Sequence, residues 1–275
     1  MLRGHHSPYF LALALLAILA ELAWRMASRR GYDRRIALST LGVAGGYVLF
    51  GVLHAGVMVA IYSFVARFAP VHWPAKDWRT WAVGFLLVEF AYYWFHRWGH
   101  FVRWMWASHM VHHSSEQLTL LSAIRLGWTN LLSGGWAVYL PVVLMGFDPR
   151  VVMALLAFDL HFQFFLHTEA PIRLGPLEWV LNTPTHHKLH HALNTPYLDR
   201  NFGGVLIIFD RMFGTFAAET PGETPRFGLV RPLETGTPWG LALGEWRRLF
   251  HDLLAARGWR STVRAAFGRP NSFNI

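Results

Sequence analysis

Histidines in this sequence fall into spaced groups that could bind metal ions. The chain of 275 residues contains 16 histidines, and one HxxxH pair and two HxxHH motifs account for half of them. These groups are His96 and His100, then His109, His112 and His113, and finally His187, His190 and His191. At this composition one HxxHH motif arises by chance in roughly one chain in 20, so two copies indicate a shared role.

The spacing of these histidines suits metal coordination by helices. Residues three and four apart share one face of a helix, so each motif can direct imidazoles to one side. Imidazole is the usual nitrogen ligand of iron, zinc, copper and nickel. An HxxxH pair alone is as often structural as metal-binding, whereas two HxxHH motifs together favour a metal site. Eight imidazoles exceed the needs of one ion, so the sequence predicts two metal ions.

Other polar residues follow helical spacing within apolar stretches. Glu89 lies seven residues before His96, and Asp159, Gln163 and His167 follow one another at intervals of four. Ionisable residues at membrane depth are costly and usually functional. We expect Glu89 and Asp159 to orient metal-binding imidazoles by hydrogen bonds.

The remaining histidines divide between further candidates and structural positions. His186 directly precedes the second HxxHH motif and is a further candidate ligand. For His161 two roles are equally supported: a metal ligand, or a residue that hydrogen-bonds between helices. Surface or structural roles are expected for His5, His6, His54, His72 and His251.

The composition predicts a membrane protein. Hydrophobic residues make up 53% of the chain and charged residues only 15%, whereas soluble domains carry about a quarter charged residues. The absence of cysteine excludes disulfides, thiolate zinc sites, iron–sulfur clusters and a cysteine nucleophile. The net charge of +9 indicates contact with a membrane surface, and no nucleic acid is expected as a partner.

Long apolar runs define the elements that must position the histidines. The runs are 16 to 30 residues long, and about 20 residues cross a bilayer as a helix. The sequence therefore predicts an all-α fold, a polytopic membrane helical bundle of about four to five spans with a cytoplasmic His-rich helical cap. The predicted spans cover residues 8–27, 36–65, 80–95, 128–145 and 151–166.

Basic residues orient these spans. A cluster of four arginines at 29–35 marks the cytoplasmic side under the positive-inside rule. Counting crossings then places the loop near residue 70 and the turn at 146–149 outside, and every histidine group inside. The chain crosses twice between His113 and His167, so the groups return to one face and can converge.

The same pattern divides the chain into three parts. We expect N-terminal membrane spans at 1–80, a di-metal core of spans and histidine cap at 81–217, and a C-terminal cytoplasmic segment at 218–275. The chain is expected to be an integral membrane protein of a bacterial inner membrane, with its site facing the cytoplasm.

Three segments carry a family resemblance that covers roughly residues 85–217. The order HxxxH, HxxHH, HxxHH on a multi-span helical chain resembles the fatty acid hydroxylase / sterol desaturase superfamily. Within it, the chain is most similar to the alkylglycerol monooxygenase-like branch. The segments that carry this likeness are QFFLHTE (163–169), LGPLEWVLNTPTHHKLHH (174–191) and DRNFGGVLIIFDRMFGTF (199–216).

The resemblance implies a set of site residues. The eight motif histidines would be both the metal ligands and the catalytic residues, with His167 as a ninth ligand. Gln163 stands where such hydroxylases have a histidine. It would act on the metal through a water molecule, or would support the ligands without binding the metal. Glu169, Asp199 and Asn201 lie in the matching segments and are expected to support the ligands.

The resemblance also implies the chemistry. It predicts a non-haem di-iron centre that uses O₂ and an external reductant, either tetrahydrobiopterin or an electron-donor protein, to hydroxylate a C–H bond of a lipid. In this branch the hydroxylation cleaves ether lipids. A sterol or carotenoid hydroxylase, or a desaturase, would use the same ligands. A membrane metal transporter is less favoured, because transport needs ligands near the bilayer midplane.

Overall fold

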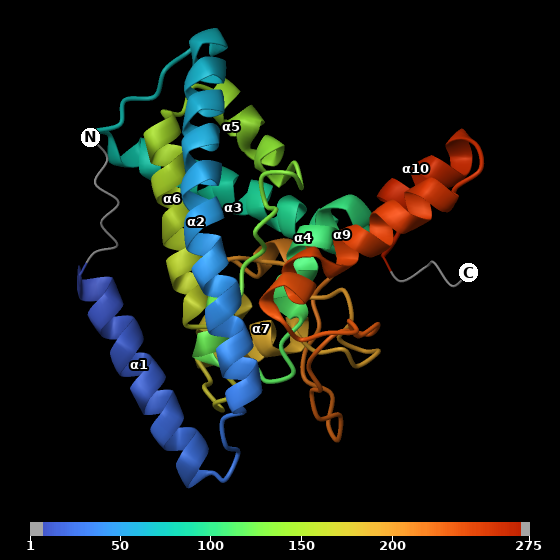
Figure 1. Cartoon of the computed structure of the whole chain (residues 1–275). Coiled ribbons are helices and arrows are strands. Elements are labelled where there is room, and N and C mark those ends of the chain that lie inside the picture. Colours follow the sequence, from blue (N-terminus) through green and yellow to red (C-terminus); the bar gives the residue numbers. More distant parts are fainter. Residues whose placement is uncertain (1–7, 271–275) are drawn as a thin grey trace.

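The computed structural model describes residues 8–270, and every long element in that range is a helix (Figure 1). The α-helices are α1 (Pro8–Ala27), α2 (Arg34–Val65), α3 (Trp78–Phe101), α4 (Arg103–His113), α5 (Leu140–Leu144), α6 (Pro149–Phe164), α7 (Pro184–His190), α8 (Ile208–Met212), α9 (Pro238–Ala255) and α10 (Trp259–Phe267). Short 3₁₀ helices are η1 (Ala66–Phe68), η2 (Leu120–Ile124), η3 (Gly135–Tyr139) and η4 (Gly175–Trp179). The all-α prediction is confirmed.

The first two helices are the strongest candidates to cross a membrane. By length and hydropathy, Tyr9–Ala27 and Arg34–Phe68 both qualify, and most of their surface is exposed. The α2 helix starts where the Asp33 side chain accepts hydrogen bonds from the backbone N–H groups of Arg35 and Ile36. Its 32 residues extend about 48 Å, which exceeds the hydrocarbon thickness of about 30 Å.

The predicted count of four to five spans is not confirmed. Only two helices among the described residues meet the criteria of length and hydropathy. Helix α3 has 24 residues. Helix α6 has 16 residues and extends about 24 Å, which is less than the hydrocarbon thickness of about 30 Å. The expected span at 128–145 is wrong as one helix, because this stretch consists of turns, η3 and the five-residue α5. Gly134, at φ 74°, and Pro141 interrupt it, and neither favours a helix interior.

Two loops that were both expected outside lie side by side. The Trp73 backbone N–H donates to Gly146 O (3.0 Å), its indole N–H donates to Met145 O (3.1 Å), and its ring stacks on Phe147. Gly146 has φ 97°, and a Cβ there would overlap the Val71 carbonyl oxygen. This contact lies at the end of the bundle opposite α7 (Figure 1).

The core between the long helices is apolar and aromatic. Tyr62 of α2, Val88 and Tyr92 of α3, Val143 of α5 and Val152 of α6 are buried together. This packing joins helices that are far apart in sequence and holds the histidine-bearing end of α3 against α6.

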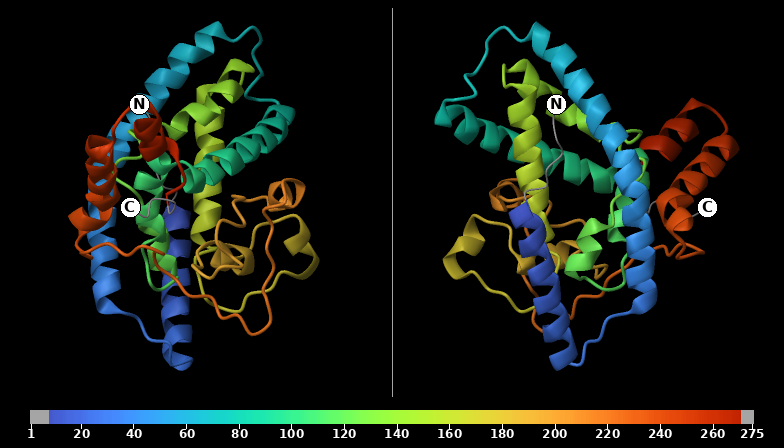
Figure 2. Two further views of the ribbon diagram at one scale, coloured as in Figure 1. Left: turned by 90° about the vertical axis from the view of Figure 1, so that its right-hand side faces the viewer. Right: turned by 60° about the vertical axis from the view of Figure 1, so that its left-hand side comes forward.

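Helix α1 lies apart from this core, beside the end of α6 (Figures 1 and 2). The Phe10 ring lies 3.9 Å from the His161 ring between centroids and packs edge-on against Phe164. Further along α1, Glu21 contacts Thr168, beyond the end of α6. Helix α1 is therefore displaced along the bundle toward the His-rich segments.

Candidate metal centre

Four parts of the chain bring imidazoles together in two adjacent groups. They come from α3, from α4, from the residues that follow α6, and from α7 with its C-cap residue. One group contains His96, His100, His109, His113 and His190; the other contains His112, His167, His187 and His191. Within each group the nitrogens all lie within 4.8 Å of one another.

The larger group is linked through Nε2 atoms. The His109 Nε2 atom lies 3.2 Å from His100 Nε2 and 3.1 Å from His113 Nε2. The His190 Nε2 atom lies 3.1 Å from His113 Nε2. His96 Nε2 is buried without a hydrogen-bond partner, which leaves its lone pair available for a cation.

The smaller group has the same geometry. His167 Nε2 lies 3.0 Å from both His112 Nε2 and His187 Nε2, and His191 Nε2 lies 3.1 Å from His187 Nε2. His167 stands just after α6 and is the member of this group that belongs to neither HxxHH motif.

Helical periodicity explains why each HxxHH motif divides between the two groups. On α4, His109 and His113 are four residues apart and join the larger group, while His112 turns to the smaller one. At α7 the assignment is reversed, because His187 and His191 join the smaller group. Each motif therefore contributes to both groups, which places the groups next to each other.

Hydrogen bonds on the other ring nitrogen orient several of these imidazoles. An Nδ1–H that donates to a carbonyl leaves Nε2 unprotonated and free to bind a metal. The carbonyls that accept such bonds are Phe202 O from His96 (2.8 Å), Arg200 O from His190 (2.8 Å), Gln163 O from His167 (2.7 Å) and Arg125 O from His112 (3.3 Å).

Sequence reasoning missed these carbonyls, because any residue type can supply one. Two of them belong to the loop at 199–202, where Asp199 and Asn201 both have positive φ, at 57° and 58°. This left-handed backbone, which Asp and Asn tolerate better than most residues, turns the loop carbonyls toward the imidazoles. The pair of short polar residues is the one signal that could have indicated the turn.

Burial keeps the imidazoles of α4 and α7 neutral. It lowers the pKa of His112 to about 4 and holds the pKa of His190 well below the ordinary value. Burial, reinforced by the neighbouring imidazoles, does the same to the pKa values of His113 and His191. These side chains are thus in the state that binds metal at neutral pH.

The donor set fits two transition-metal ions. His112 and His167 both donate Nδ1–H to a carbonyl, so their Nε2 atoms, 3.0 Å apart, are unprotonated and would repel each other unless a cation lay between them. Ligands about 2.0–2.1 Å from one ion are separated by about 3 Å, which is the spacing in both groups. Imidazole suits iron, zinc, copper and nickel, so the donor type fits iron among others.

The predicted supporting residues take different positions. Asp199 Oδ1 lies 3.3 Å from His100 Nδ1, in contact with the larger group. Glu89 Oε2 accepts from the backbone N–H groups of Val205 and Leu206, and so holds the chain just after the 199–202 loop. Asn201 binds the carbonyls of His186 and Ala217 and acts on the loop itself.

Gln163 and Asp159 form a buried network behind the smaller group. The Gln163 amide donates to Asp159 Oδ2 (2.7 Å) and accepts from the Tyr92 hydroxyl (2.8 Å). Gln163 therefore reaches His167 through its backbone carbonyl, while its side chain is engaged elsewhere.

Three other candidates lie outside both groups. His161 packs against Phe10 of α1, and the His186 ring packs against Phe216. Glu169 forms ion pairs with Arg25 and Arg30 rather than supporting an imidazole. These three residues are not among the side chains within ligand distance of each other.

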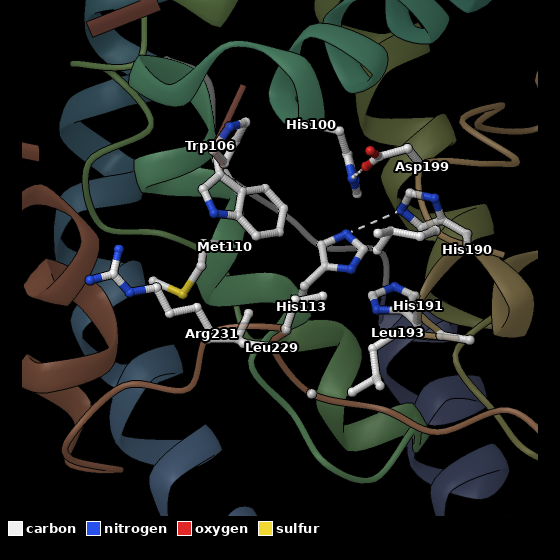
Figure 3. A pocket seen from close by; sticks show the side chains of 15 residues that line it. His100, Trp106, Met110, His113, His190, His191, Leu193, Asp199, Leu229 and Arg231 are labelled. Atoms are coloured by element: carbon white, nitrogen blue, oxygen red, sulfur yellow. Dashed lines mark hydrogen bonds and ion pairs between the residues drawn. The ribbon is translucent and has the colours of Figure 1, made fainter. Parts of the chain in front are cut away.

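A pocket reaches the larger group from the side of residues 228–231 (Figure 3). His100, His113 and His190 form its inner wall, with Asp199 beside them. Trp106, Met110, Leu193, Leu229 and Arg231 line the rest. The pocket combines an apolar surface with charged groups next to the imidazoles.

These features define an all-α membrane protein with buried histidine clusters suited to metal. The chain belongs to the fatty acid hydroxylase family, whose profile matches residues 81–215. This family membership agrees with the resemblance that the histidine motifs indicated.

The similarity to named proteins extends beyond residues 81–215. The chain is 37% identical to alkylglycerol monooxygenase of Xenopus tropicalis over 263 residues, covering 95% of this chain and 57% of the relative. The human alkylglycerol monooxygenase is 37% identical over 233 residues, covering 84% of this chain and 51% of the relative. The chain thus spans about half the length of these relatives.

A more distant relative has a different substrate in its name. Ornithine lipid hydroxylase of Rhizobium tropici is 25% identical over 220 residues, covering 76% of this chain and 65% of the relative. No solved structure matches the chain.

Proposed function

We propose that this protein is a membrane-bound non-haem di-iron oxygenase that hydroxylates a C–H bond of a lipid. The observation that carries the proposal is the pair of adjacent all-imidazole groups, with five and four members. All of them lie within residues 81–217, which we propose as the catalytic core, with 1–80 and 218–275 as flanking segments.

Two iron ions held by these imidazoles would supply O₂ activation and the insertion of one oxygen atom into a C–H bond. The second oxygen leaves as water, so each turnover consumes two electrons and two protons from an external reductant. The chain's own residues position the ligands: Nδ1 bonds to backbone carbonyls fix the ring orientation, and Asp199 contacts His100. Burial of the imidazoles keeps bulk water away from the reaction.

An ether lipid is the proposed substrate. Alkylglycerol monooxygenases match most of this chain, and hydroxylation of the carbon next to an ether oxygen would break that ether. A second candidate is hydroxylation of a polar lipid with an amino-acid headgroup, supported by the similarity to ornithine lipid hydroxylase. Sterol or carotenoid hydroxylation and desaturation would need the same metal ligands and a differently shaped substrate cavity.

The reductant is proposed to approach through the pocket beside His100 and His190. This opening reaches the larger imidazole group and is lined by Asp199 and Arg231, which suit a polar partner. Tetrahydrobiopterin and an electron-donor protein are the two candidates. The arginine-rich cluster at 29–35 supports a cytoplasmic site on a bacterial inner membrane.

Metal transport is a poorer fit to this arrangement. A transported ion needs ligands near the bilayer midplane and a path out on each side. Here the imidazoles gather around the ends of helices, and backbone carbonyls lock several of them in place. Such a site suits retained ions.

The test is product analysis under ¹⁸O₂. Membranes with the protein are incubated with ether lipids, ornithine lipids, fatty acids and sterols, with and without tetrahydrobiopterin. We expect one ¹⁸O atom in an ether-lipid product, and none with the His112→Ala variant. His72→Ala, in an exposed loop, is the control. Full ¹⁸O incorporation by His112→Ala, or one readily exchangeable ion per chain and no product, would refute the proposal.

A further inference from the structure

Helices α9 and α10 form a hairpin with an unusual exposed face. Phe250 and Leu254 of α9 are four residues apart, and their side chains are 50% and 89% exposed. Trp259, Val263 and Phe267 of α10 follow at intervals of four and are 72%, 50% and 56% exposed. Side chains at this spacing share one face of a helix, so each helix presents an apolar stripe.

The charges of the hairpin are sorted between its two sides. Its two acidic residues, Glu245 and Asp252, turn inward and pair with the buried Arg103 of α4, at 3.3 Å and 2.7 Å. Its outward surface is basic, with exposed arginines at positions 247, 257, 260 and 264. On α10, Arg260 and Arg264 directly follow Trp259 and Val263, so basic side chains border the apolar stripe.

Two contacts fix where the hairpin lies. At its start, Pro238 packs against Gly42 in the third turn of α2, near the basic end of that helix. At its end, Gly268 O accepts a hydrogen bond from Arg103 N, just beyond the last residue of α3 (3.1 Å). The hairpin thus bridges the start of α2 and the end of α3, the ends that carry the arginine cluster and the HxxxH pair.

Helix α3 runs obliquely across the bundle, so its end and α4 lie near mid-height in Figure 1, above the start of α2. The hairpin packs against α4, where the ring centroids of Trp104 and Trp246 lie 5.0 Å apart. Figures 1 and 2 show the hairpin projecting sideways from the bundle beside α4, between the heights of the two ends of α2.

We propose that the α9–α10 hairpin is an interfacial anchor that lies in the headgroup layer of a bilayer containing anionic lipid. Trp259, Val263 and Phe267 enter the boundary between headgroups and acyl chains, and the arginines pair with lipid phosphates. Aromatic and basic side chains together on one amphipathic surface are typical of this location. Attraction to anionic lipid adds to the burial of the apolar stripe.

The absence of cysteine in this chain makes the test direct. Leu254→Cys and Val263→Cys are each labelled with a nitroxide in the full-length protein, reconstituted in bilayers with and without anionic lipid. Both positions are exposed, so the label does not disturb the core. Thr220→Cys, exposed in the 218–225 loop, is the matched control.

We expect labels at 254 and 263 to collide several-fold more with lipid-dissolved O₂, relative to a water-soluble nickel chelate, than the label at 220. Anionic lipid should raise this ratio, and Arg257→Gln together with Arg260→Gln should remove the rise. A ratio equal to the control would overturn the anchor. Insertion without any dependence on anionic lipid would overturn the role of the arginines. Dipolar broadening between labelled copies would instead assign the face to a second copy of the chain.

Discussion

Arg25 Nη1 lies 2.9 Å from Glu169 Oε1, and this ion pair ties α1 to the chain two residues beyond His167. Arg25 is only 2% exposed although the helix around it is largely exposed. Glu21, one turn earlier, accepts from the Thr168 hydroxyl (2.5 Å) and from Leu120 N (2.8 Å). Glu21 and Arg25, the two charged residues that interrupt the first apolar run, thus contact the segment that follows the candidate ligand His167.

The first prediction concerns this pair. Arg25→Met removes the buried guanidinium and leaves Glu169 with only the exposed Arg30, so we expect a loss of about 1–3 kcal/mol of stability. The smaller imidazole group should also retain metal less well. Arg79→Met is the control, because Arg79 is 69% exposed and its solvent-screened pair with Asp77 should contribute little to stability. Equal thermal stability of the two variants would contradict the prediction.

The second prediction separates the two imidazole groups. His190→Ala removes a member of the larger group and His112→Ala one of the smaller. We expect metal content to fall from two ions toward one per chain in each variant, with loss of lipid hydroxylation, as measured by elemental analysis of purified protein. His251→Ala, whose side chain is 82% exposed, should keep both ions. Two retained ions in His190→Ala would remove this residue from the ligand set.

The third prediction is the pH dependence of the metal-free protein. Burial lowers the pKa of His112 to about 4, against about 6.5 in the unfolded chain. Between these values the unfolded state binds the proton and the folded state does not, so stability rises with pH there. Acidification from pH 7 to pH 5 should therefore lower the free energy of unfolding, on the order of 1 kcal/mol per pH unit for each such imidazole, and the melting temperature should fall with it.

Metal provides the check on this third prediction. Protons and metal compete for the same imidazole nitrogens, so metal should raise the melting temperature more at pH 7 than at pH 5. The measurement is a melting curve in detergent at each pH with and without added Fe²⁺. A metal-free protein as stable at pH 5 as at pH 7 would contradict the prediction.

The fourth prediction tests the packing behind the smaller group. A Cβ at Gly204 would overlap Asp159 Oδ1 and contact the Tyr92 ring, within the network that includes Gln163. Gly204→Ala is expected to cost about 1–3 kcal/mol, since neither neighbour can move away freely. Gly236→Ala meets nothing within 4 Å and should change stability little. A melting temperature for Gly204→Ala within about one degree of that for Gly236→Ala would contradict the prediction, because Asp159 and Tyr92 would then shift at little cost.

Much of the fold could be predicted from local pattern. The apolar runs at 8–27 and 36–65 correspond closely to α1 and α2, because length and hydropathy are local properties. The run at 128–145 is less apolar, and Gly134 and Pro141 divide it into short pieces. Average hydropathy does not register such interruptions, so the expected span there was wrong.

Glu169 illustrates the same limit in the candidate site. It follows His167 closely in sequence and was expected to support a ligand, but its partners are Arg25 and Arg30. Those partners are more than 130 residues away, and only the docking of α1 brings them near.

The sequence alone determined which residue types stand at helical spacing, namely histidines three and four apart, and which apolar runs, at 8–27 and 36–65, are long enough to cross a bilayer. These are consequences of the periodicity of a helix, which depends only on near neighbours. Tertiary structure decided how each HxxHH motif divides between the two groups and which backbone carbonyls orient His96 and His190. The first outcome depends on helices packing at a particular rotation, which no local pattern encodes. The second depends on a loop in left-handed backbone, for which Asp199 and Asn201 are the one local signal.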